Sequence, residues 1–402
     1  MSIHNQPVTG RAGVPASGIT VSRLLLLSTA AGVGVASLYY NQPLLGQMAT
    51  DMRAGPSSIG LVSSFTQAGY AIGMLLVVPL GDMISRRKLI LISAALTSVI
   101  LLATAFSTGL SWLLIFSGLL GICNMTPQLL LPLAAQLAAP GKRGHVVGMM
   151  LSGIFAGVVL SRTVAGFVGA TWGWRYLFIG AAIVQAIVLL MLYVTLPNNR
   201  PTYTGRYIDL LKTIVHLLHD QPVLREACLF GATLFGAFMV FWSSLIHLMS
   251  AEPFSLGPEA VGIYGIVGAG AALLSPIAGR AADHGHARGL AAAMTILAIV
   301  SFGILWEWRT SLIGIGIGVL ALDLGVQLAH VANQSRILHG APEAQSRIQT
   351  AYMTAYFGGG GLGAAIGTLA WQYYGWTGVC AAGAALLCIP LIRCLFPLNV
   401  AH

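Results

Sequence analysis

The feature that most constrains this chain is a succession of apolar blocks, each about as long as a membrane-crossing helix. An α-helix needs roughly 20 apolar residues to span about 30 Å of hydrocarbon. Hydrophobic residues make up 56% of the chain and charged residues only 8%, whereas soluble domains carry roughly 25% charged residues. The sequence therefore predicts an all-α membrane protein that crosses the bilayer many times.

Twelve such blocks can be placed along the chain. The predicted spans are 21–45, 57–81, 88–107, 111–137, 146–169, 175–196, 226–249, 259–281, 289–306, 311–334, 348–371 and 376–397. A polar stretch from Pro197 to Arg225 separates the first six from the last six, and Tyr207 to His219 within it has apolar residues at helical spacing. We therefore expect a disordered tail over 1–20, a six-helix half over 21–196, a cytoplasmic linker with an amphipathic helix over 197–225, and a second six-helix half over 226–402.

The basic residues are distributed unevenly between the two sides of the predicted membrane. With the N-terminus inside, sixteen of the 20 Lys and Arg residues fall on the cytoplasmic side and three fall outside. Loops on the cytoplasmic side of membrane proteins carry this kind of excess. The net charge of +9 therefore orients the chain and does not indicate nucleic-acid binding. We expect a protein of the inner or plasma membrane with both termini in the cytoplasm.

The two predicted halves repeat each other at a shift of about 200 residues. The segment "GVASLYYNQPLL" from Gly34 resembles "GAFMVFWSSLIH" from Gly236, and "WGWRYLF" from Trp172 resembles "YGWTGV" from Tyr374. Internal repeats of this kind are typical of transporters whose binding site lies between the two halves. The repeat therefore predicts two pseudo-symmetric six-helix halves.

The loop between the second and third spans resembles a motif of the major facilitator superfamily, G-x-x-x-D-R/K-x-G-R/K-R/K. In this chain "VPLGDMISRRK" supplies Asp82, Arg86 and Arg87, with Val78 and Ser85 in place of the two glycines. The resemblance extends over essentially the whole chain. It implies the major facilitator fold and transport by alternating access.

A second copy of this motif, "GRAADHGHAR", precedes span nine and retains Asp283. An acid at a helix end beside arginines can form a salt bridge that holds one conformation closed. Asp82, Arg86, Arg87 and Asp283 are therefore candidate gating residues. The alternative is a solvated charge cluster that only anchors the topology.

Within the superfamily, the chain is most similar to the 12-span drug:proton antiporters, which share the short central loop and "GWR" at span six. The span-five pattern of that branch, G-x-x-x-G-P-x-x-G-G, appears here as "GIFAGVVLSRTVAG", with Ser161 and Arg162 at the Gly-Pro position. Ser117 stands where the branch carries an arginine in span four. The positive charge inside the membrane therefore lies in span five.

Asp323 and Arg162 are the two fully charged residues predicted to lie deep within spans. A charge at the centre of the bilayer costs roughly 2.5–3.5 kcal/mol on insertion scales, so such residues usually face a bundle interior or a wet cavity. Gln327, His330 and Gln334 follow Asp323 on one narrow face of span ten. The sequence predicts that this polar face lines a path through the membrane.

The resemblance implies that spans one, four, seven and ten line a central cavity. The candidate substrate-cavity residues on these spans are Tyr39, Tyr40, Asn41, Gln42, Asn124, Gln128, Trp242, Ser243, Ser244, His247, Gln327 and Gln334. Asp323, Arg162 and His330 are the candidate proton-coupling residues, because an acid whose exposure alternates can gain and lose a proton that a histidine can relay. The alternative is a static Asp323–Arg162 ion pair that serves packing alone.

We therefore expect a secondary active transporter of a small organic solute, working by proton-coupled efflux. A proton-coupled importer or a uniporter is the first alternative, and a non-transporting membrane sensor is the second. The sequence has no H-E-x-x-H, GxSxG or Walker-type motif, so we expect no enzyme activity, no cofactor and no metal. The expected partners are the solute, protons and the lipid bilayer, and we expect a monomer.

Overall fold

The computed structural model describes residues 19–139, 141–198, 205–273, 287–338 and 345–395. Every regular element within these residues is an α-helix. The helices are α1 (Val21–Ala36), α2 (Asn41–Met52), α3 (Pro56–Leu76), α4 (Leu80–Met83), α5 (Arg86–Ala105), α6 (Leu110–Cys123), α7 (Thr126–Leu137), α8 (Arg143–Trp172), α9 (Trp174–Thr195), α10 (Tyr207–Asp220), α11 (Pro222–Ser250), α12 (Pro258–Leu273), α14 (Ala287–Glu307), α15 (Leu312–Leu338) and α16 (Gln345–Leu395).

Ten helical stretches in the described residues are long and apolar enough to cross a membrane. One of them lies in α16, whose 51 residues follow a path of about 75 Å at a rise of 1.5 Å per residue. This path is long enough for two crossings, and the backbone of α16 bends at Gly375 (φ 60°, ψ −151°), between the predicted spans eleven and twelve. Helix α12, described over 16 residues, begins where span eight was predicted. The predicted all-α membrane fold is confirmed.

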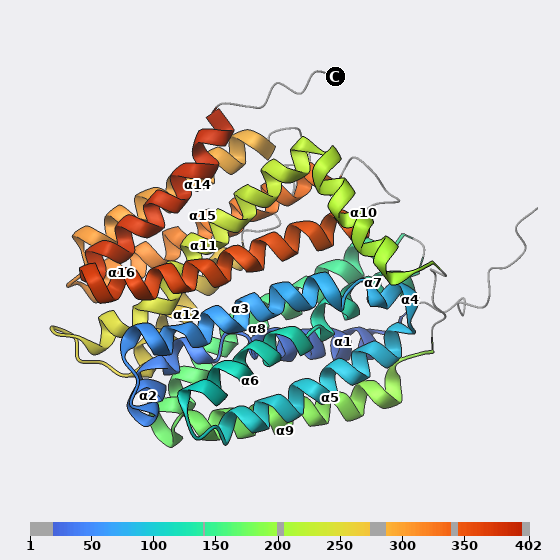
Figure 1. Ribbon diagram of the computed structural model, residues 1–402, viewed down its shortest axis with the longest axis horizontal. Helices are drawn as coiled ribbons and strands as arrows, with labels where there is room; N and C mark the ends of the chain where they lie inside the picture. The colour runs from blue at the N-terminus through green and yellow to red at the C-terminus, as the bar shows by residue number, and fades with distance from the viewer. Residues whose placement is uncertain (1–18, 140, 199–204, 274–286, 339–344, 396–402) are drawn as a thin grey trace, which may run out of the picture.

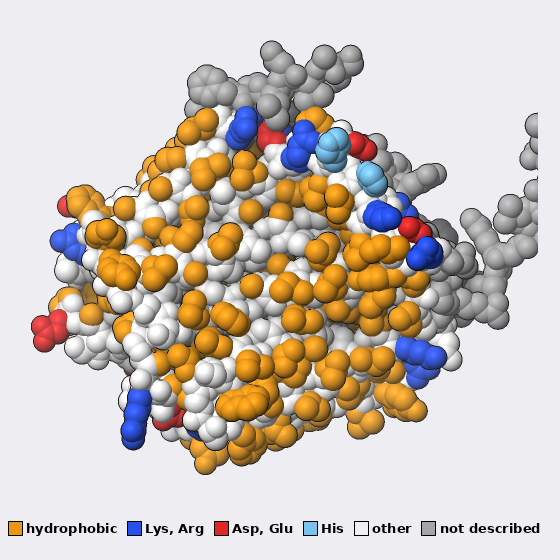
Figure 2. Space-filling view, viewed as in Figure 1, with side chains coloured by type: hydrophobic (Ala, Val, Ile, Leu, Met, Phe, Trp, Pro, Cys, Tyr) orange, Lys and Arg blue, Asp and Glu red, His pale blue; other side chains and the backbone are white. Residues whose placement is uncertain are grey.

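The helices lie side by side along one axis in two groups (Figure 1). Helices α1 to α9, blue to green, form one group, and α11, α14, α15 and α16, yellow-green to red, form the other. Hydrophobic side chains cover the band between the two ends of the bundle (Figure 2). We call the end that carries Arg86, Arg87 and helix α10 the basic end. The sequence prediction of a helix in the linker corresponds to α10.

Two of the predicted spans are broken in the middle, which the apolar pattern did not predict. Helices α6 and α7 form one span, interrupted where Pro127 lacks the N–H that would bond to the Cys123 carbonyl. The Ser93 hydroxyl donates to that carbonyl instead. At the break, the Asn124 amide donates to the Gly34 carbonyl of α1 at 2.6 Å. The first span has a similar break, because a turn over residues 37–40 separates α1 from α2.

The two groups of helices are in close contact at the end opposite the basic end. Gly60, near the start of α3, approaches α16 so closely that an added Cβ would lie 2.1 Å from Oγ1 of Thr368. On the other side of the bundle, the Thr163 hydroxyl of α8 donates to the Gly262 carbonyl of α12 at 3.1 Å. Small residues permit such close helix packing in membranes. The two groups therefore pack closely at these two contacts.

Candidate functional site

Arg162 lies in the middle of α8 with only 2% of its surface exposed. Its Nε donates a hydrogen bond to Oε1 of Gln42, on α2, at 2.8 Å. Its guanidinium carbon lies 3.8 Å from the ring centre of Trp242, 5.2 Å from that of Tyr39 and 5.4 Å from that of Phe238. Aromatic faces attract cations, most strongly when water is excluded. A buried cation is therefore held here mainly by aromatic rings and one neutral amide.

Asp323 lies on α15 and is 8% exposed. Its Oδ1 accepts a hydrogen bond from Nε1 of Trp242 at 3.2 Å. Gly268 of α12 faces the same carboxylate, because a Cβ added there would lie 2.0 Å from Oδ2. The acid is therefore enclosed between α11, α12 and α15.

Arg162 and Asp323 come from opposite halves, and both contact Trp242. The indole presents its face to the guanidinium and its N–H to the carboxylate. The two charges interact electrostatically, but they do not form one of the ion pairs shorter than 4 Å in the described part of the chain. The sequence predicted that these two residues are the buried charges, and in the structure both contact the same aromatic side chain, Trp242.

Several buried polar side-chain atoms of the predicted site residues have no hydrogen-bond partner among the described residues. They are Nη2 of Arg162, Nε2 of Gln327, Oγ of Ser244 and Nε2 of His247. Each buried donor without a partner costs on the order of 1–3 kcal/mol. Such groups in a protein mark places where water or a ligand is expected to bind.

Other predicted cavity residues in the first half form hydrogen bonds within that half. Asn41 donates to the Thr66 hydroxyl at 3.1 Å and accepts from Ser63 at 2.8 Å. Gln128 donates to the Tyr70 hydroxyl at 3.1 Å. Together with the Asn124 bond described above, these contacts give the amides a structural role in this conformation. Whether they also contact a solute stays a prediction.

Of the remaining predicted cavity residues, two pack against aromatic rings and one forms a hydrogen bond within its own helix. Tyr40 packs edge-on against Phe178, with ring centres 6.4 Å apart. Ser243 donates to a carbonyl of its own helix at 2.6 Å. The His247 ring stacks on Trp371 of α16 at 5.7 Å. These side chains lie within the bundle without a common contact to Arg162 or Asp323 in the described residues.

The polar face of α15 continues from Asp323 toward the basic end. Nδ1 of His330 lies 2.9 Å from the Tyr352 hydroxyl, and the rings of His330 and Tyr356 lie 4.5 Å apart. Further along, Gln334 donates to Gln349 at 3.0 Å. The part of this polar face that lies toward the basic end is therefore in contact with α16.

The predicted gating residues of the first half form polar contacts at the basic end. Arg86 forms an ion pair with Asp82 at 2.9 Å. Arg87 donates to the Asn198 side chain and to the Tyr193 carbonyl, each at 2.7 Å. Asp283, the fourth predicted gating residue, lies outside the described residues. The gating role of all four stays a prediction.

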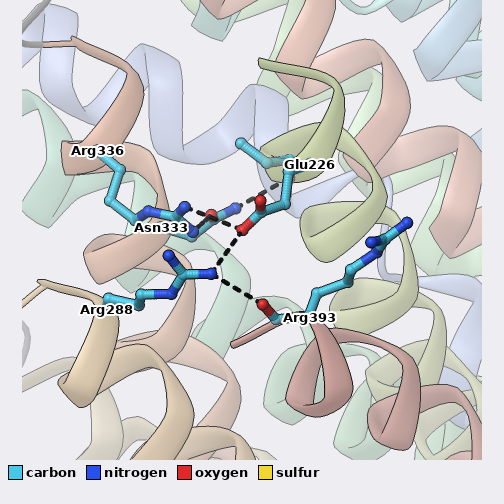
Figure 3. Close-up of polar contacts among 6 residues, drawn as sticks. Glu226, Arg288, Asn333, Arg336 and Arg393 are labelled. Carbon is cyan, nitrogen blue, oxygen red and sulfur yellow. Dashed lines mark hydrogen bonds and ion pairs between the residues drawn. The ribbon is translucent and has the colours of Figure 1, made fainter. Parts of the chain in front are cut away.

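One charged cluster was missed by the sequence analysis. The Glu226 carboxylate, 6% exposed, lies 3.0 Å from Nη2 of Arg336 and 3.6 Å from Nη2 of Arg288. Figure 3 shows both arginines pointing toward Glu226, with Arg288 also donating to the Arg393 carbonyl at 2.9 Å. The cluster joins α11, α14, α15 and α16. An acid at the first position of a predicted span was the one signal that could have indicated it.

A two-part bundle of apolar helices with opposite charges buried between the parts is the architecture of a multi-pass membrane transporter. Residues 25–364 match the family model of the Major Facilitator Superfamily. The chain is 38% identical to the Uncharacterized transporter YgaY of Escherichia coli O157:H7, over 94% of this chain and 96% of that protein. It is 32% identical to the Probable transporter SCO4007 of Streptomyces coelicolor, over 90% of this chain and 85% of that protein. The chain belongs to the major facilitator superfamily.

The fold also matches solved structures at low sequence identity. A bacterial homolog of the human lysosomal transporter Spinster, in an inward-facing and occupied conformation, superimposes with a TM-score of 0.73. That match covers 92% of this chain and 94% of the other, at 14% identity. A likeness at this identity establishes the fold and leaves the solute and the coupling ion to be argued from the residues of this chain.

Proposed function

We propose that this protein is a proton-coupled secondary transporter that exports a small organic solute from the cytoplasm in exchange for protons. It resides in the inner or plasma membrane as a monomer, with the basic end and both termini on the cytoplasmic side, as the excess of basic residues at that end favours. The observation that carries this proposal is the meeting of Arg162 and Asp323 at Trp242, since these residues come from opposite halves.

Alternating access would couple proton binding to solute transport, because it changes the distance between Arg162 and Asp323. In major facilitator transporters, one half rocks against the other around a central site. Arg162 moves with the first half, whereas Asp323 and Trp242 move with the second. The attraction between the two charges therefore depends on the conformation. Arg162 keeps Asp323 ionised in the state in which the halves meet and releases it to bind a proton in the other state.

His330 offers a route for that proton toward the basic end. It lies two turns from Asp323 on the same face of α15, and Tyr352 continues the polar contacts. Asp82 and Arg86 act as a latch that stabilises one conformation at the basic end. These roles explain why polar residues follow one face of an otherwise apolar helix.

Symport is the second candidate, and one observation favours it. The unpartnered Nη2 of Arg162 would donate hydrogen bonds to an anionic group of a solute. Such a group would leave Asp323 without its counter-charge, so that solute and proton would bind together and travel in the same direction. Export by exchange and uptake by symport therefore differ in the sign of proton movement that the solute causes.

Everted membrane vesicles distinguish these candidates. The vesicle interior is acidified by respiration, and drugs, sugars, amino acids and carboxylates are added outside while a fluorescent dye reports the internal pH. Exchange raises the internal pH on addition of a solute, whereas symport lowers it. Vesicles that lack the protein serve as the control. If no solute moves protons in either direction, the proton-coupled function is wrong.

The variant Asp323→Asn tests the residue assigned to coupling. It retains the volume and the acceptor oxygen for Trp242 but cannot carry the charge. We expect it to abolish proton-driven accumulation while exchange of labelled for unlabelled solute continues. The matched control is Asp209→Asn, which removes an exposed acid on α10. Normal accumulation by Asp323→Asn would place the coupling site elsewhere.

A further inference from the structure

We propose that the transported solute is a small organic acid and that Arg162 binds its carboxylate. This inference rests on the proposed proton-coupled transport through the same central site. It applies to exchange and to symport, and the vesicle experiment distinguishes these two. It names the chemical class of the solute and the residue that selects it. Three features of the site support it: an incomplete set of partners for the guanidinium, unoccupied hydroxyl groups beside it, and an unfavourable environment for a cation.

The guanidinium of Arg162 has more donors than acceptors around it. It carries five N–H groups, and its one hydrogen bond to a described residue uses Nε and the neutral amide of Gln42. Nη2 is buried without a partner. Burial of a charge is costly unless an opposite charge and hydrogen bonds compensate it. A carboxylate is the group that matches the paired donors of a guanidinium.

Asp323 does not complete this set. Its Oδ1 accepts a hydrogen bond from the Trp242 indole, and among the described residues Asp323 and Arg162 do not form an ion pair within 4 Å. Arg162 and Asp323 also belong to halves that move apart in the transport cycle. The position next to Nη2 therefore remains available to an acid that comes from outside the protein.

Two tyrosines provide further groups for an acid beside Arg162. Tyr39 and Tyr356 are buried, and neither hydroxyl forms a hydrogen bond with another described residue. The ring centre of Tyr39 lies 5.2 Å from the guanidinium carbon of Arg162. The ring of Tyr356 lies 4.5 Å from that of His330, on the face of α15 that carries Asp323. Phenol hydroxyls can donate to a carboxylate. The ring of Tyr356 stacks on Phe235 at 4.2 Å, so the same region offers an apolar wall for the body of the solute.

A cationic solute would meet the opposite situation. Asp323 is the acid that could bind it, but Gly268 and Trp242 enclose this carboxylate. The solute would also lie close to a buried guanidinium that lacks an ion-pair partner within 4 Å among the described residues. Like charges in a dry site repel strongly because the local dielectric constant is low. The site therefore favours anions over cations.

The test compares matched probes on the purified full-length protein in nanodiscs. Benzoate and hexanoate supply the carboxylate on an aromatic and an aliphatic body. Benzamide and hexanamide keep the shape without the charge, and benzylamine and hexylamine reverse the charge. Binding is measured as the concentration dependence of the shift in Tm. We expect at least one carboxylate to raise Tm and to bind at least 10-fold more tightly than its amide and its amine.

Two variants identify the residue responsible. Arg162→Gln should weaken carboxylate binding at least 10-fold. Arg162→Lys should weaken it by less, because Lys keeps the positive charge but lacks the paired N–H donors of a guanidinium. Arg175→Gln, the matched control, replaces an arginine that pairs with Asp51 away from the central site, and it should retain carboxylate binding. We expect Arg162→Gln to fold, because Asp323 can bind a proton once its counter-charge is removed.

The outcomes separate this inference from the proposed function. If neither carboxylate binds, if an amide or amine binds as well as the matching acid, or if Arg162→Gln keeps full carboxylate affinity, the inference is wrong. The vesicle experiment is independent of these results. A neutral or cationic solute that moves protons would support the proposed function while overturning the organic-acid inference.

Discussion

The two halves of the molecule carry ion clusters of different construction at the basic end. In the first half, Asp82 and Arg86 are four residues apart in sequence, and their side chains are 27% and 12% exposed. In the second half, Glu226 is 6% exposed and lies between Arg336 and Arg288, which come from two other helices. One cluster is local and partly hydrated, whereas the other is buried and joins distant parts of the chain.

This difference indicates different roles for the two clusters. An exposed ion pair contributes between 0 and about 1 kcal/mol, so the cost of opening it in each transport cycle is small. Removing one partner of a buried pair costs about 3–5 kcal/mol, because the remaining charge is left without compensation. We therefore expect the Asp82–Arg86 pair to act as a switch and the Glu226 cluster to act as a permanent joint that holds α11, α14, α15 and α16 together.

The largest effect is expected for Glu226→Ala. This variant leaves Arg336 and Arg288 without their shared acid, and we expect it to lower the free energy of unfolding by about 3–5 kcal/mol. The measurement is thermal and denaturant unfolding in nanodiscs, with Asp82→Ala as the matched acid-to-alanine control. A similar loss of unfolding free energy in the two variants would contradict the different roles assigned to the Glu226 cluster and the Asp82–Arg86 pair.

A smaller effect is expected when the arginines of the joint are replaced one at a time. The Arg336 side chain is 14% exposed and lies 3.0 Å from Glu226, whereas Arg288 is 38% exposed and 3.6 Å away. Arg288→Ala should therefore cost at most about 1 kcal/mol, and Arg336→Ala should cost more. Both variants are compared by the same unfolding measurement. A larger loss for Arg288→Ala would contradict the assignment of Arg336 as the main partner.

The smallest change in stability, with a clear change in rate, is expected for Asp82→Asn. The exposed pair contributes no more than about 1 kcal/mol, so Tm should remain nearly unchanged. Transport should nevertheless slow, because the variant removes a charge that stabilises one conformation. The rate is measured with a solute that moves protons in vesicles. A normal rate at normal expression would favour a solvated cluster that only anchors the topology.

The sequence was sufficient to predict the fold because membrane spans are local. Each apolar block satisfies its backbone within one helix, and α1, α11 and α14 begin within four residues of the predicted positions. The breaks near Tyr40 and Asn124 were not predicted, because an apolar block has the same composition whether its helix is continuous or interrupted. Pro127 was the visible signal for the second break, and its effect depended on the distant Ser93 hydroxyl.

The candidate site was predicted only in part. Asp323 and Arg162 stand out because charges within apolar helices are costly wherever they lie. Their shared contact with Trp242 was not predictable, since it depends on how α8, α11 and α15 cross. The Glu226 cluster was missed for a related reason: its three side chains come from positions 226, 288 and 336, and no spacing rule connects the ends of separate helices.

The glycine beside Asp323 has a consequence for how variants of this protein should be interpreted. Gly268 lies on α12, away from the charged residues in sequence, and its replacement by alanine would ordinarily count as a mild change in a membrane helix. Here the added methyl group would occupy the space of the Asp323 carboxylate oxygen. A random screen for inactive mutants would therefore recover substitutions at Gly268 alongside those at Asp323. Second-site revertants of such mutants should carry smaller or shorter side chains at neighbouring positions of α15. Their positions would identify the residues that border Asp323 in the central site.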